Sequence, residues 1–517
     1  MGDAGASPGN TSALTGPDRK SSGELDQNLS VGGGRPPSTA NPWWFRAGFY
    51  GLIGAIVFTM FQDLPSELVG GLGIGLMLVL LVMKVPVAVA MGFAGGLGVF
   101  VLSGTRVLAV TFQDVPFRSV GSWSLSVLPM FIFMGLLLWR SGATEKLYDA
   151  TREWLGWLPG GLAVGTNFAG AGLAAVSGST LGVTYALGRI GVPEMLRAGY
   201  DRRLATASIL MAGTGGQLIP PSILLVIYAG IVSIPVGPQL LAGFVPGVLL
   251  AVVYGTLIVA VAAMFPRLTG RGRRGEPGIA AKVDTSWSGR WTTLAKVWPI
   301  PVLAISVLFG LYMGVFTATE AGAVGALGAI FITGWYLRLT GFVTAVRQAL
   351  GDTVKATGGI FLLLVGAMIL NRLLTLSGAA SWTARFIDEL GLGRVQFLLV
   401  MLLIYLILGM FMDPLTMMLI TVPILMPTIA ALDISLIWFG VFVVLLGELS
   451  IITPPVGILT FIVHRLVQDD EVNLGHRISL ADVFVGVLWF IPASVGVLVI
   501  LILFPELAEW LPNAMRR

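Results

Sequence analysis

The sequence contains no cysteine and only two histidines, His464 and His476, among its 517 residues. Without cysteine the chain has no disulfide, no thiolate nucleophile and no thiolate metal ligand, and two histidines argue against a histidine-built transition-metal centre. Charged residues are also scarce, at 11%, whereas hydrophobic residues make up 56% of the chain. This balance is far from that of a soluble globular protein and predicts a chain whose solvent is lipid.

Further absences remove whole classes of function. The net charge of +4 is not gathered into a basic stripe with interleaved aromatic residues, so no nucleic-acid partner is predicted. The chain shows no nucleophile and base pair and no His-Glu-x-x-His metal motif, which argues against an enzyme. Rings of charge and a repeated filter sequence, which are typical of channels, are also missing. A membrane carrier without an organic cofactor is the class that is left.

Composition divides the chain into six predicted segments. Residues 1–42 are rich in Gly, Ser, Pro and Asn and are predicted to be a disordered tail, and residues 43–62 an extra transmembrane helix. Two apolar repeats, 68–264 and 298–506, flank a basic linker at 265–297, and a short tail follows at 507–517. The positive-inside rule places the linker in the cytoplasm, and counting spans back from it places the N-terminal tail there too.

Three prolines of the first repeat have counterparts in the second repeat, and each pair is separated by the same number of residues. Its members are Pro193, Pro220 and Pro221 in the first repeat, and Pro427, Pro454 and Pro455 in the second. Such a duplication in an apolar chain is typical of transporters whose two repeats pack about a pseudo-two-fold axis. If each half crosses the membrane an odd number of times, the second repeat is inverted relative to the first. We therefore predict an all-α polytopic membrane protein built from two inverted repeats.

Each repeat contains a polar turn followed by an interrupted helix. We call residues 176–180 and 409–414 the first and second tips, and residues 213–222 and 447–457 the first and second breaks. The apolar segments after the tips, 180–192 and 414–426, would end at proline after 13 residues. Such a helix reaches only about 20 Å into a hydrocarbon core about 30 Å thick. Each tip is therefore predicted to be the apex of a re-entrant hairpin.

A break at membrane depth survives only where protein, water or a ligand satisfies its freed backbone groups. Freed carbonyls and hydroxyls suit a hard cation such as Na⁺, and the N-terminal ends of half-helices suit an anion. The pattern therefore favours a cation-coupled carrier of small organic anions. Two carboxyl groups, those of Asp413 and Glu448, each have two possible roles. Asp413 could ligate a cation or only cap the helix that begins at Pro414, and Glu448 could pair with a basic group or face a water-filled cavity.

The motifs in these blocks resemble the large membrane subunit of the tripartite ATP-independent periplasmic (TRAP) transporters. The matching stretches are Ser177-Gly178-Ser179, Pro193-Glu194-Met195, 213–222, 409–413 and Thr453-Pro454-Pro455-Val456-Gly457. The resemblance implies an elevator-type secondary transporter of the bacterial inner membrane that imports a C4-dicarboxylate or another organic acid with sodium. It also implies two partners, which are a small four-helix membrane subunit and a soluble periplasmic substrate-binding protein. A self-sufficient sodium/dicarboxylate symporter of similar architecture is the alternative.

Carried over by position, the resemblance implies two sets of site residues. The sodium-binding set is Ser177, Gly178, Ser179, Thr180, Gly213, Thr214, Gly216, Gln217, Asp413, Thr416, Ser450 and Thr453. The substrate-binding set is Ser179, Pro220, Pro221, Ser222, Asp413, Glu448, Pro454, Pro455 and Gly457. The chain departs from the family pattern at Leu459, where an asparagine is usual.

Overall fold

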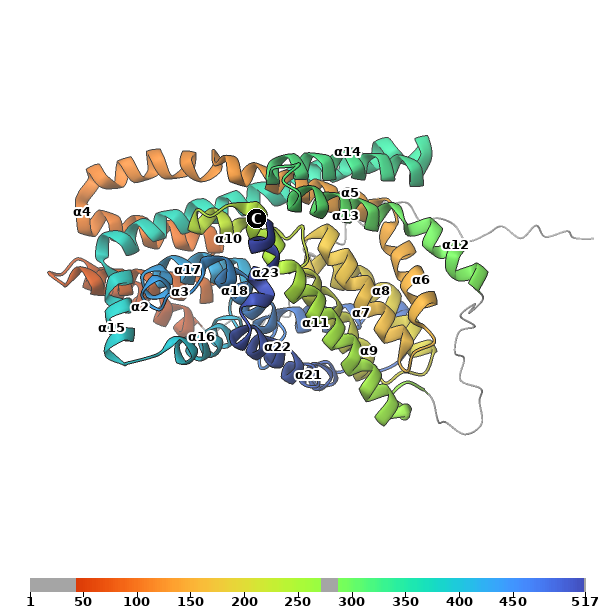
Figure 1. The fold of residues 1–517 in the computed structure, drawn as a ribbon. Helices are drawn as coiled ribbons and strands as arrows, with labels where there is room; N and C mark the ends of the chain where they lie inside the picture. The colour runs from red at the N-terminus through yellow and green to blue at the C-terminus, as the bar shows by residue number, and fades with distance from the viewer. Residues whose placement is uncertain (1–42, 271–286, 516–517) are drawn as a thin grey trace, which may run out of the picture. The chain divides into compact units, whose positions relative to one another are not determined.

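The computed structural model describes residues 43–270 and 287–515, and within these ranges every regular element is a helix (Figure 1). The predicted disordered tail 1–42 lies outside the described residues, as do 271–286 of the predicted linker. The chain divides into two compact units, one up to Gly54 and one from Ala55 onward. Helix α2 (Trp43–Met60) begins in the first unit. All other elements belong to the second unit.

The first repeat contains both long apolar helices and short helices. In order they are α3 (Ser66–Val82), α4 (Val87–Val120), η1 (Trp123–Ser126), α5 (Val127–Arg140), α6 (Ala143–Leu155), α7 (Gly161–Ser177), α8 (Thr180–Arg197), α9 (Arg202–Gly216), α10 (Ile223–Val232) and α11 (Val236–Met264). The turn η2 (Pro266–Leu268) follows, and α12 (Trp287–Val297) precedes the second repeat. Helix α4 is broken at Gly104, whose φ of +75° is left-handed and therefore favours glycine.

The second repeat has a similar order of short helices after one very long helix. Its elements are α13 (Pro299–Tyr312), α14 (Ala318–Ser377), α15 (Ala379–Glu389), α16 (Arg394–Leu408), α17 (Pro414–Ala431), α18 (Leu436–Ser450), α19 (Ile458–Leu466), α20 (Asp470–Asn473), α21 (Leu480–Leu488), α22 (Ile491–Leu503) and α23 (Glu506–Met515). The pair α7 and α8 therefore corresponds to α16 and α17, and the interrupted helix α9–α10 corresponds to α18–α19.

The described residues contain seven helices that are long and apolar enough to cross a membrane, or eight if the bent pair α12 and α13 forms one span. Six shorter apolar helices accompany them, including α7, α10, α16 and α18. Large apolar side chains are exposed on the long helices, for example Phe331, Trp335 and Val354 on α14. A water-soluble protein would hide such side chains, whereas lipid accommodates them. The described part of the chain is therefore long and apolar enough to cross a membrane several times.

The ends of two helices differ from the sequence prediction. Helices α8 and α17 do not end at Pro193 and Pro427 but continue through these residues, so the prediction that each segment stops at proline is wrong. At 18 residues each, they reach about 27 Å. A proline removes one N–H and bends a helix, but neighbouring helices in a membrane protein can compensate for this loss. The predicted runs 321–339 and 356–372 both lie in α14, in the regions of its two candidate membrane spans, Ala318–Leu337 and Gly341–Ser377.

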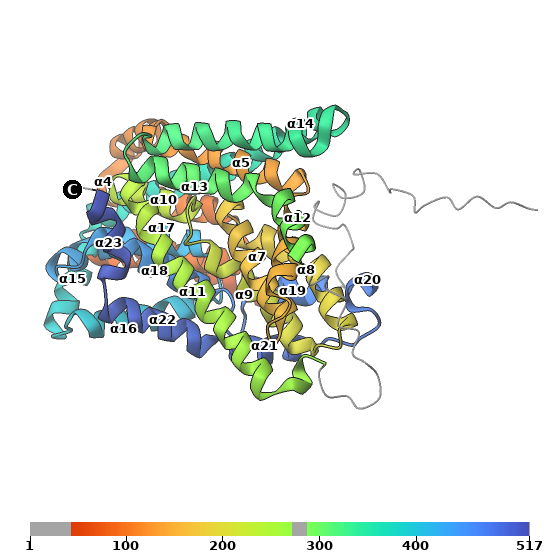
Figure 2. The same ribbon diagram turned by 45° about the vertical axis from the view of Figure 1, so that its right-hand side comes forward.

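Within residues 55–517 the helices pack in two groups. Helix α14 packs along α4 and α5 and also contacts α13, and these helices lie together at the top of Figures 1 and 2. Helices α7, α8 and α9 pack on one another, and α9 also contacts α11 and α21. Helices α16 and α17 of the second repeat pack on α18, and both α17 and α18 contact α10, while α18 also contacts α11. The second group therefore combines tips and breaks from both repeats.

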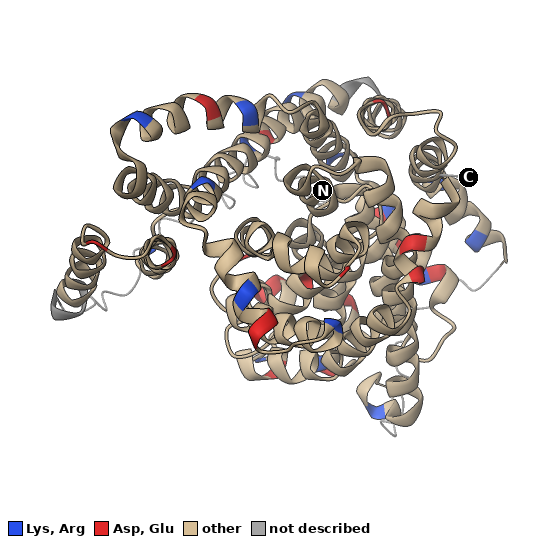
Figure 3. Cartoon of the chain, turned by 60° about the vertical axis from the view of Figure 1, so that its left-hand side comes forward, with Lys and Arg blue, Asp and Glu red and all other residues tan. Residues whose placement is uncertain are grey.

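Charged side chains are sparse along the helices, as Figure 3 shows by the few blue and red segments on the tan ribbon. Several of them form ion pairs between the two repeats. Asp482 on α21 lies 3.2 Å from Arg202 and 3.2 Å from Arg203, and Arg189 on α8 lies 3.1 Å from Asp469. Arg140 at the end of α5 pairs with Asp352 on α14. These pairs connect elements that are far apart in the sequence.

Candidate functional site

The first tip closes one helix and opens the next within four residues. Helix α7 ends at Ser177, and Gly178 follows with a left-handed φ of +61° that a residue with a Cβ would adopt only with strain. Ser179 is extended, and its hydroxyl accepts a hydrogen bond from the N–H of Gly182 at 3.1 Å as the N-cap of α8. The chain therefore turns back on itself at the predicted position, because a C-cap glycine and an N-cap serine stand side by side.

The second tip uses a carboxylate in place of the serine. Asp413 is the N-cap of α17, and its carboxylate accepts hydrogen bonds from the N–H of Thr416 at 3.3 Å and from the Thr416 hydroxyl at 2.5 Å. Pro414 occupies the first helical position, where its missing N–H costs nothing. The capping interpretation of Asp413 is confirmed. Its role as a cation ligand stays a prediction.

Both breaks interrupt helices at the predicted residues. Helix α9 ends at Gly216, and α10 begins after Ser222, whose hydroxyl accepts the N–H of Leu225 at 3.3 Å. Helix α18 ends at Ser450, and its hydroxyl donates to the Gly447 carbonyl at 2.7 Å. Thr453 donates in the same way to the Leu449 carbonyl at 2.7 Å. Local hydroxyls thus satisfy part of the backbone that each break frees.

Each tip packs directly on the break of its own repeat, and glycine allows the close approach. A Cβ at Gly213 would lie 3.0 Å from the Thr180 Cγ2 and 3.1 Å from the Thr184 Oγ1. A Cβ at Gly409 would lie 2.3 Å from the Cβ of Ser450. These contacts bring together residues predicted for the same cation site, namely Thr180 with Gly213 in the first repeat. In the second repeat they bring the tip against Ser450.

A single buried hydrogen bond joins the two repeats at this point. The Thr180 hydroxyl of the first tip donates to the Glu448 carboxylate of the second break at 2.9 Å. Both side chains are buried, with 3% and 2% of the residue surface exposed. Asp413 lies close enough to Glu448 for electrostatic repulsion between the two carboxylates. The first tip, the second tip and the second break therefore meet around Glu448.

Three buried side-chain oxygens in the first tip, in α8 and in the first break have no hydrogen-bond partner among the described residues. They are the Oγ of Ser177, the Oγ1 of Thr184 and the Oε1 of Gln217. The sequence motifs predicted Ser177 and Gln217 but not Thr184. Its position one helical turn after Thr180 was the available signal, because residues four apart share a face of a helix. Unpartnered buried oxygens are costly unless a ligand satisfies them, and hard cations prefer oxygen ligands.

The predicted residues of the two breaks differ in their exposure to solvent. Pro220, Pro221 and Ser222 of the first break are buried, whereas Pro455 of the second break is exposed. Leu459, the predicted departure from the family pattern, is fully buried, and its N–H donates to the Ile451 carbonyl at 3.1 Å. Thr460, which the sequence motifs did not predict, donates to the Ile452 carbonyl at 3.3 Å. The second break is thus the more open one.

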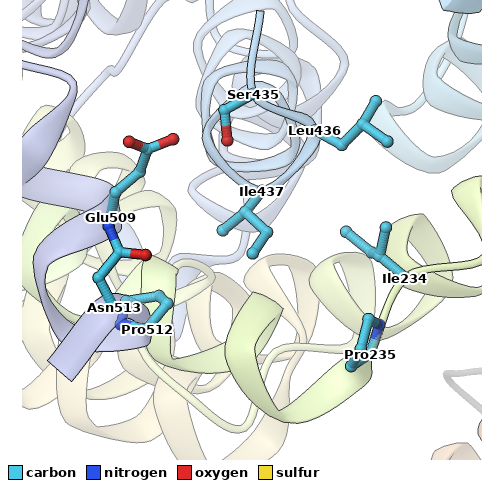
Figure 4. Close-up of a pocket in the computed structure, with 8 residues that line it drawn as sticks. All are labelled: Ile234, Pro235, Ser435, Leu436, Ile437, Glu509, Pro512 and Asn513. Carbon is cyan, nitrogen blue, oxygen red and sulfur yellow. The ribbon is translucent and has the colours of Figure 1, made fainter. Parts of the chain in front are cut away.

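Two surface pockets lie away from the tips. One has a volume of about 400 Å³ and is lined by Ile234, Pro235, Ser435, Leu436, Ile437, Glu509, Pro512 and Asn513. Its polar groups include Glu509 and Asn513 from α23, which face Ser435 and the isoleucines across the pocket (Figure 4). The other, of about 440 Å³, is lined by Arg189, Ile190, Pro193, Glu194, Arg197, Glu471 and Val472. Neither pocket includes a residue of the tips or breaks.

Comparisons with known proteins match most of the membrane region. The family described as the tripartite ATP-independent periplasmic transporter, DctM component, matches residues 74–507. The C4-dicarboxylate TRAP transporter large permease protein DctM of Pseudomonas aeruginosa is 31% identical, over 72% of this chain and 84% of that protein. The ectoine/5-hydroxyectoine TRAP transporter large permease protein UehC of Ruegeria pomeroyi is 28% identical, over 80% and 92%.

Two further similarities extend the comparison. The sialic acid TRAP transporter permease protein SiaT of Haemophilus influenzae is 27% identical, over 77% of this chain and 61% of that protein. Among solved structures, the YdaH transporter of Alcanivorax borkumensis aligns with a TM-score of 0.52 over 80% of this chain and 89% of that chain. At 16% sequence identity, this structure supports a shared fold and nothing more.

The fold, the paired tips and breaks and the matched family together define a multi-pass transporter of the inner membrane. The chain belongs to the DctM family of TRAP transporter large permease subunits, as its motifs predicted. Since this is a family of transporters, the expectation that the chain is not an enzyme agrees with its family.

Proposed function

We propose that this permease subunit imports a small organic acid together with Na⁺, driven by the sodium gradient. The observation that carries the proposal is that the first tip, the helix after it and the first break each bury a side-chain oxygen without a partner, in Ser177, Thr184 and Gln217. Side-chain hydroxyl and amide oxygens, with the carbonyls freed by a broken helix, are the donor set of a Na⁺ site. Bound there, Na⁺ would supply the positive charge that offsets an anionic substrate.

The donors for a second cation lie in the other repeat. Gly409 packs against Ser450, and Thr416 lies against Asp413, so tip and break again supply neighbouring oxygens. These residues fit a hard cation because a carboxylate and hydroxyls are present together. Asp413, already engaged as a helix cap, would contribute a remaining lone pair.

The substrate is proposed to carry a carboxylate. Relatives named for C4-dicarboxylates, ectoine and sialic acid transport compounds that share this group. The helix starts at Ser179, Ser222 and Gly457 present N-terminal N–H groups, which favour an anion. The substrate positions Pro220, Pro221, Pro454 and Pro455 belong to the connections that lead into these helix starts.

The family membership also supports the proposed assembly and orientation. We propose a small four-helix membrane subunit and a soluble periplasmic substrate-binding protein as partners, in addition to the lipid bilayer. The 1–42 tail and the 265–297 linker are proposed to be cytoplasmic. Transport would proceed as an elevator, in which the group of helices that carries tips and breaks moves against α4, α5, α13 and α14.

Uptake of radiolabelled organic acids into proteoliposomes tests this function. The vesicles would hold the chain with its small membrane subunit, with and without an inward Na⁺ gradient and the soluble binding protein. We expect uptake only when both are present. Uptake with Na⁺ but without the binding protein would identify the self-sufficient symporter. Uptake that ignores the Na⁺ gradient would overturn the proposal of sodium coupling.

A further inference from the structure

Glu448 occupies an unusual position for an acidic residue. It lies in the second break, is 2% exposed, and its carboxylate accepts a hydrogen bond from Thr180 of the opposite repeat. Its neighbours in the helix contact the second tip, since a Cβ at Gly447 would lie 2.8 Å from the Cβ of Pro414. The sequence motifs placed Glu448 in the substrate site. In the structure its carboxylate instead contacts Thr180, which is a residue of the proposed first cation site.

The carboxylate of Glu448 has no cationic partner among the residues that the structure describes. The ion pairs formed within residues 43–270 and 287–515 do not include it. The nearby charged group is Asp413, which has the same sign and makes burial harder. A buried charge persists only where it is paired or coordinates an ion, and one hydroxyl hydrogen bond does not replace a countercharge. The carboxylate can therefore stay ionised only when a positive charge binds beside it, and without one it takes up a proton; the oxygens around Thr180 would hold such a cation.

The direction of the hydrogen bond defines how Glu448 would help. A threonine hydroxyl has one proton and two lone pairs. Because the proton of Thr180 is donated to Glu448, both lone pairs stay available for a cation. The unpartnered oxygen of Thr184 lies one turn further along α8, and both threonines occupy the space into which a Cβ on Gly213 would point. Glu448 therefore holds one oxygen of this cluster in the orientation that a cation requires.

We propose that Glu448 is a positioning residue and the countercharge of the first cation site, rather than a substrate ligand. The second repeat thereby completes the cation site of the first, and cation binding in one repeat depends on the position of the other. This inference rests on the proposed sodium coupling and assigns one further residue to it.

Binding of Na⁺ to the purified chain with its small membrane subunit tests this proposal without transport. Thermal unfolding would be followed while NaCl replaces KCl at constant ionic strength, since a bound ion stabilises the folded state. We expect Glu448→Gln, which keeps the size and the acceptor oxygen but removes the charge, to raise the half-saturating Na⁺ concentration about tenfold. The half-saturating substrate concentration for uptake at saturating Na⁺ should stay within about twofold of the wild-type value.

A matched pair of variants at Thr180 controls for folding. Thr180→Val removes the hydroxyl and should weaken Na⁺ binding, whereas Thr180→Ser keeps it and should restore near-normal binding. If Glu448→Gln does not fold, Glu448→Asp replaces it, because the shorter side chain keeps the charge but draws the carboxylate away from Thr180, and it should also raise the half-saturating Na⁺ concentration. An unchanged Na⁺ midpoint in Glu448→Gln would overturn the proposal, and a raised substrate midpoint alone would return Glu448 to the substrate site. Wild-type protein that shows no Na⁺ effect in binding or uptake would instead refute sodium coupling itself.

Discussion

At the scale of single residues, the site depends on glycines that allow backbones and side chains to meet. Gly213, Gly409 and Gly447 each lie where an added Cβ would come within about 3 Å of the opposing tip or break. Only a residue without a side chain allows these helices to approach so closely. The polar side chains nearby can converge only because the glycines leave room for them.

We predict that Gly409→Ala weakens the contact between the second tip and the second break. The new Cβ would lie 2.3 Å from the Ser450 Cβ and Oγ, and such overpacking costs on the order of 1–3 kcal/mol. The backbone at this residue, with φ of −64°, suits alanine, so the effect is steric. Thermal stability and uptake should both fall.

The control for this variant is Gly358→Ala on α14, where a Cβ meets nothing within 4 Å. Alanine favours a helix over glycine by about 1 kcal/mol, so this protein should be as stable as the wild type or more so. Equal stability and uptake for both variants would show that the close packing at Gly409 is unimportant.

At the scale of elements, ion pairs connect helices of the two repeats where no covalent link exists. Asp482 near the start of α21 is 6% exposed in its side chain and pairs with Arg202 and Arg203 at the start of α9. It also caps its own helix by accepting the N–H of Ser479 at 3.0 Å. One carboxylate therefore neutralises two cations and organises a helix start, which makes it harder to replace than an exposed surface charge.

We predict that Asp482→Asn destabilises the protein by about 2 kcal/mol. This magnitude lies between that of an exposed and that of a buried ion pair, because the two arginines are partly solvated. Thermal unfolding would measure the loss. The matched control is Asp114→Asn, which removes the exposed pair with Arg118 and should change stability by less than about 0.5 kcal/mol. Similar effects of the two substitutions would refute the special role of Asp482.

At the scale of the whole molecule, the proposed elevator divides the helices into a fixed and a moving group. The fixed group is α4, α5, α13 and α14, and the moving group includes α10 and the other helices that carry tips and breaks. The turn η1 leads directly into α5 of the fixed group, so its contacts with α10 lie between the groups. A Cβ at Gly230 of α10 would lie 2.8 Å from the Leu125 Cδ2 of η1. Contacts of α5 with α14, such as Val127 with Gly322, lie inside the fixed group.

Because the chain has no cysteine, cross-linking can test this division without background. We predict that Leu125→Cys with Gly230→Cys, bridged by Hg²⁺, stops uptake and that a thiol reagent restores it. The control is Val127→Cys with Gly322→Cys, whose bridge should leave uptake at about the level of the unbridged protein, since both residues stay together throughout the cycle. Uptake that survives the first bridge would contradict the proposed movement of α10.

Local signals in the sequence predict much of this architecture. Capping residues, glycines with left-handed φ and proline pairs act within a few residues, so the positions of Ser179, Asp413 and both breaks could be predicted. The ends of α8 and α17 could not, because whether a helix passes through Pro193 or Pro427 depends on neighbours that compensate for the lost hydrogen bond. Thr184 was missed because its hydroxyl matters only through its proximity to Gly213.

The amino-acid sequence alone identifies this chain as a membrane transporter of the TRAP large-subunit type, with two hairpins and two broken helices. Composition and local motifs carry this information, since they reflect the solvent of each segment and the conformation of each turn. Which of these parts meet is set by the tertiary packing. The hydrogen bond from Thr180 to Glu448 and the pairing of Asp482 with two arginines join residues from different repeats. Such contacts depend on long-range packing, for which a single sequence has no local signal.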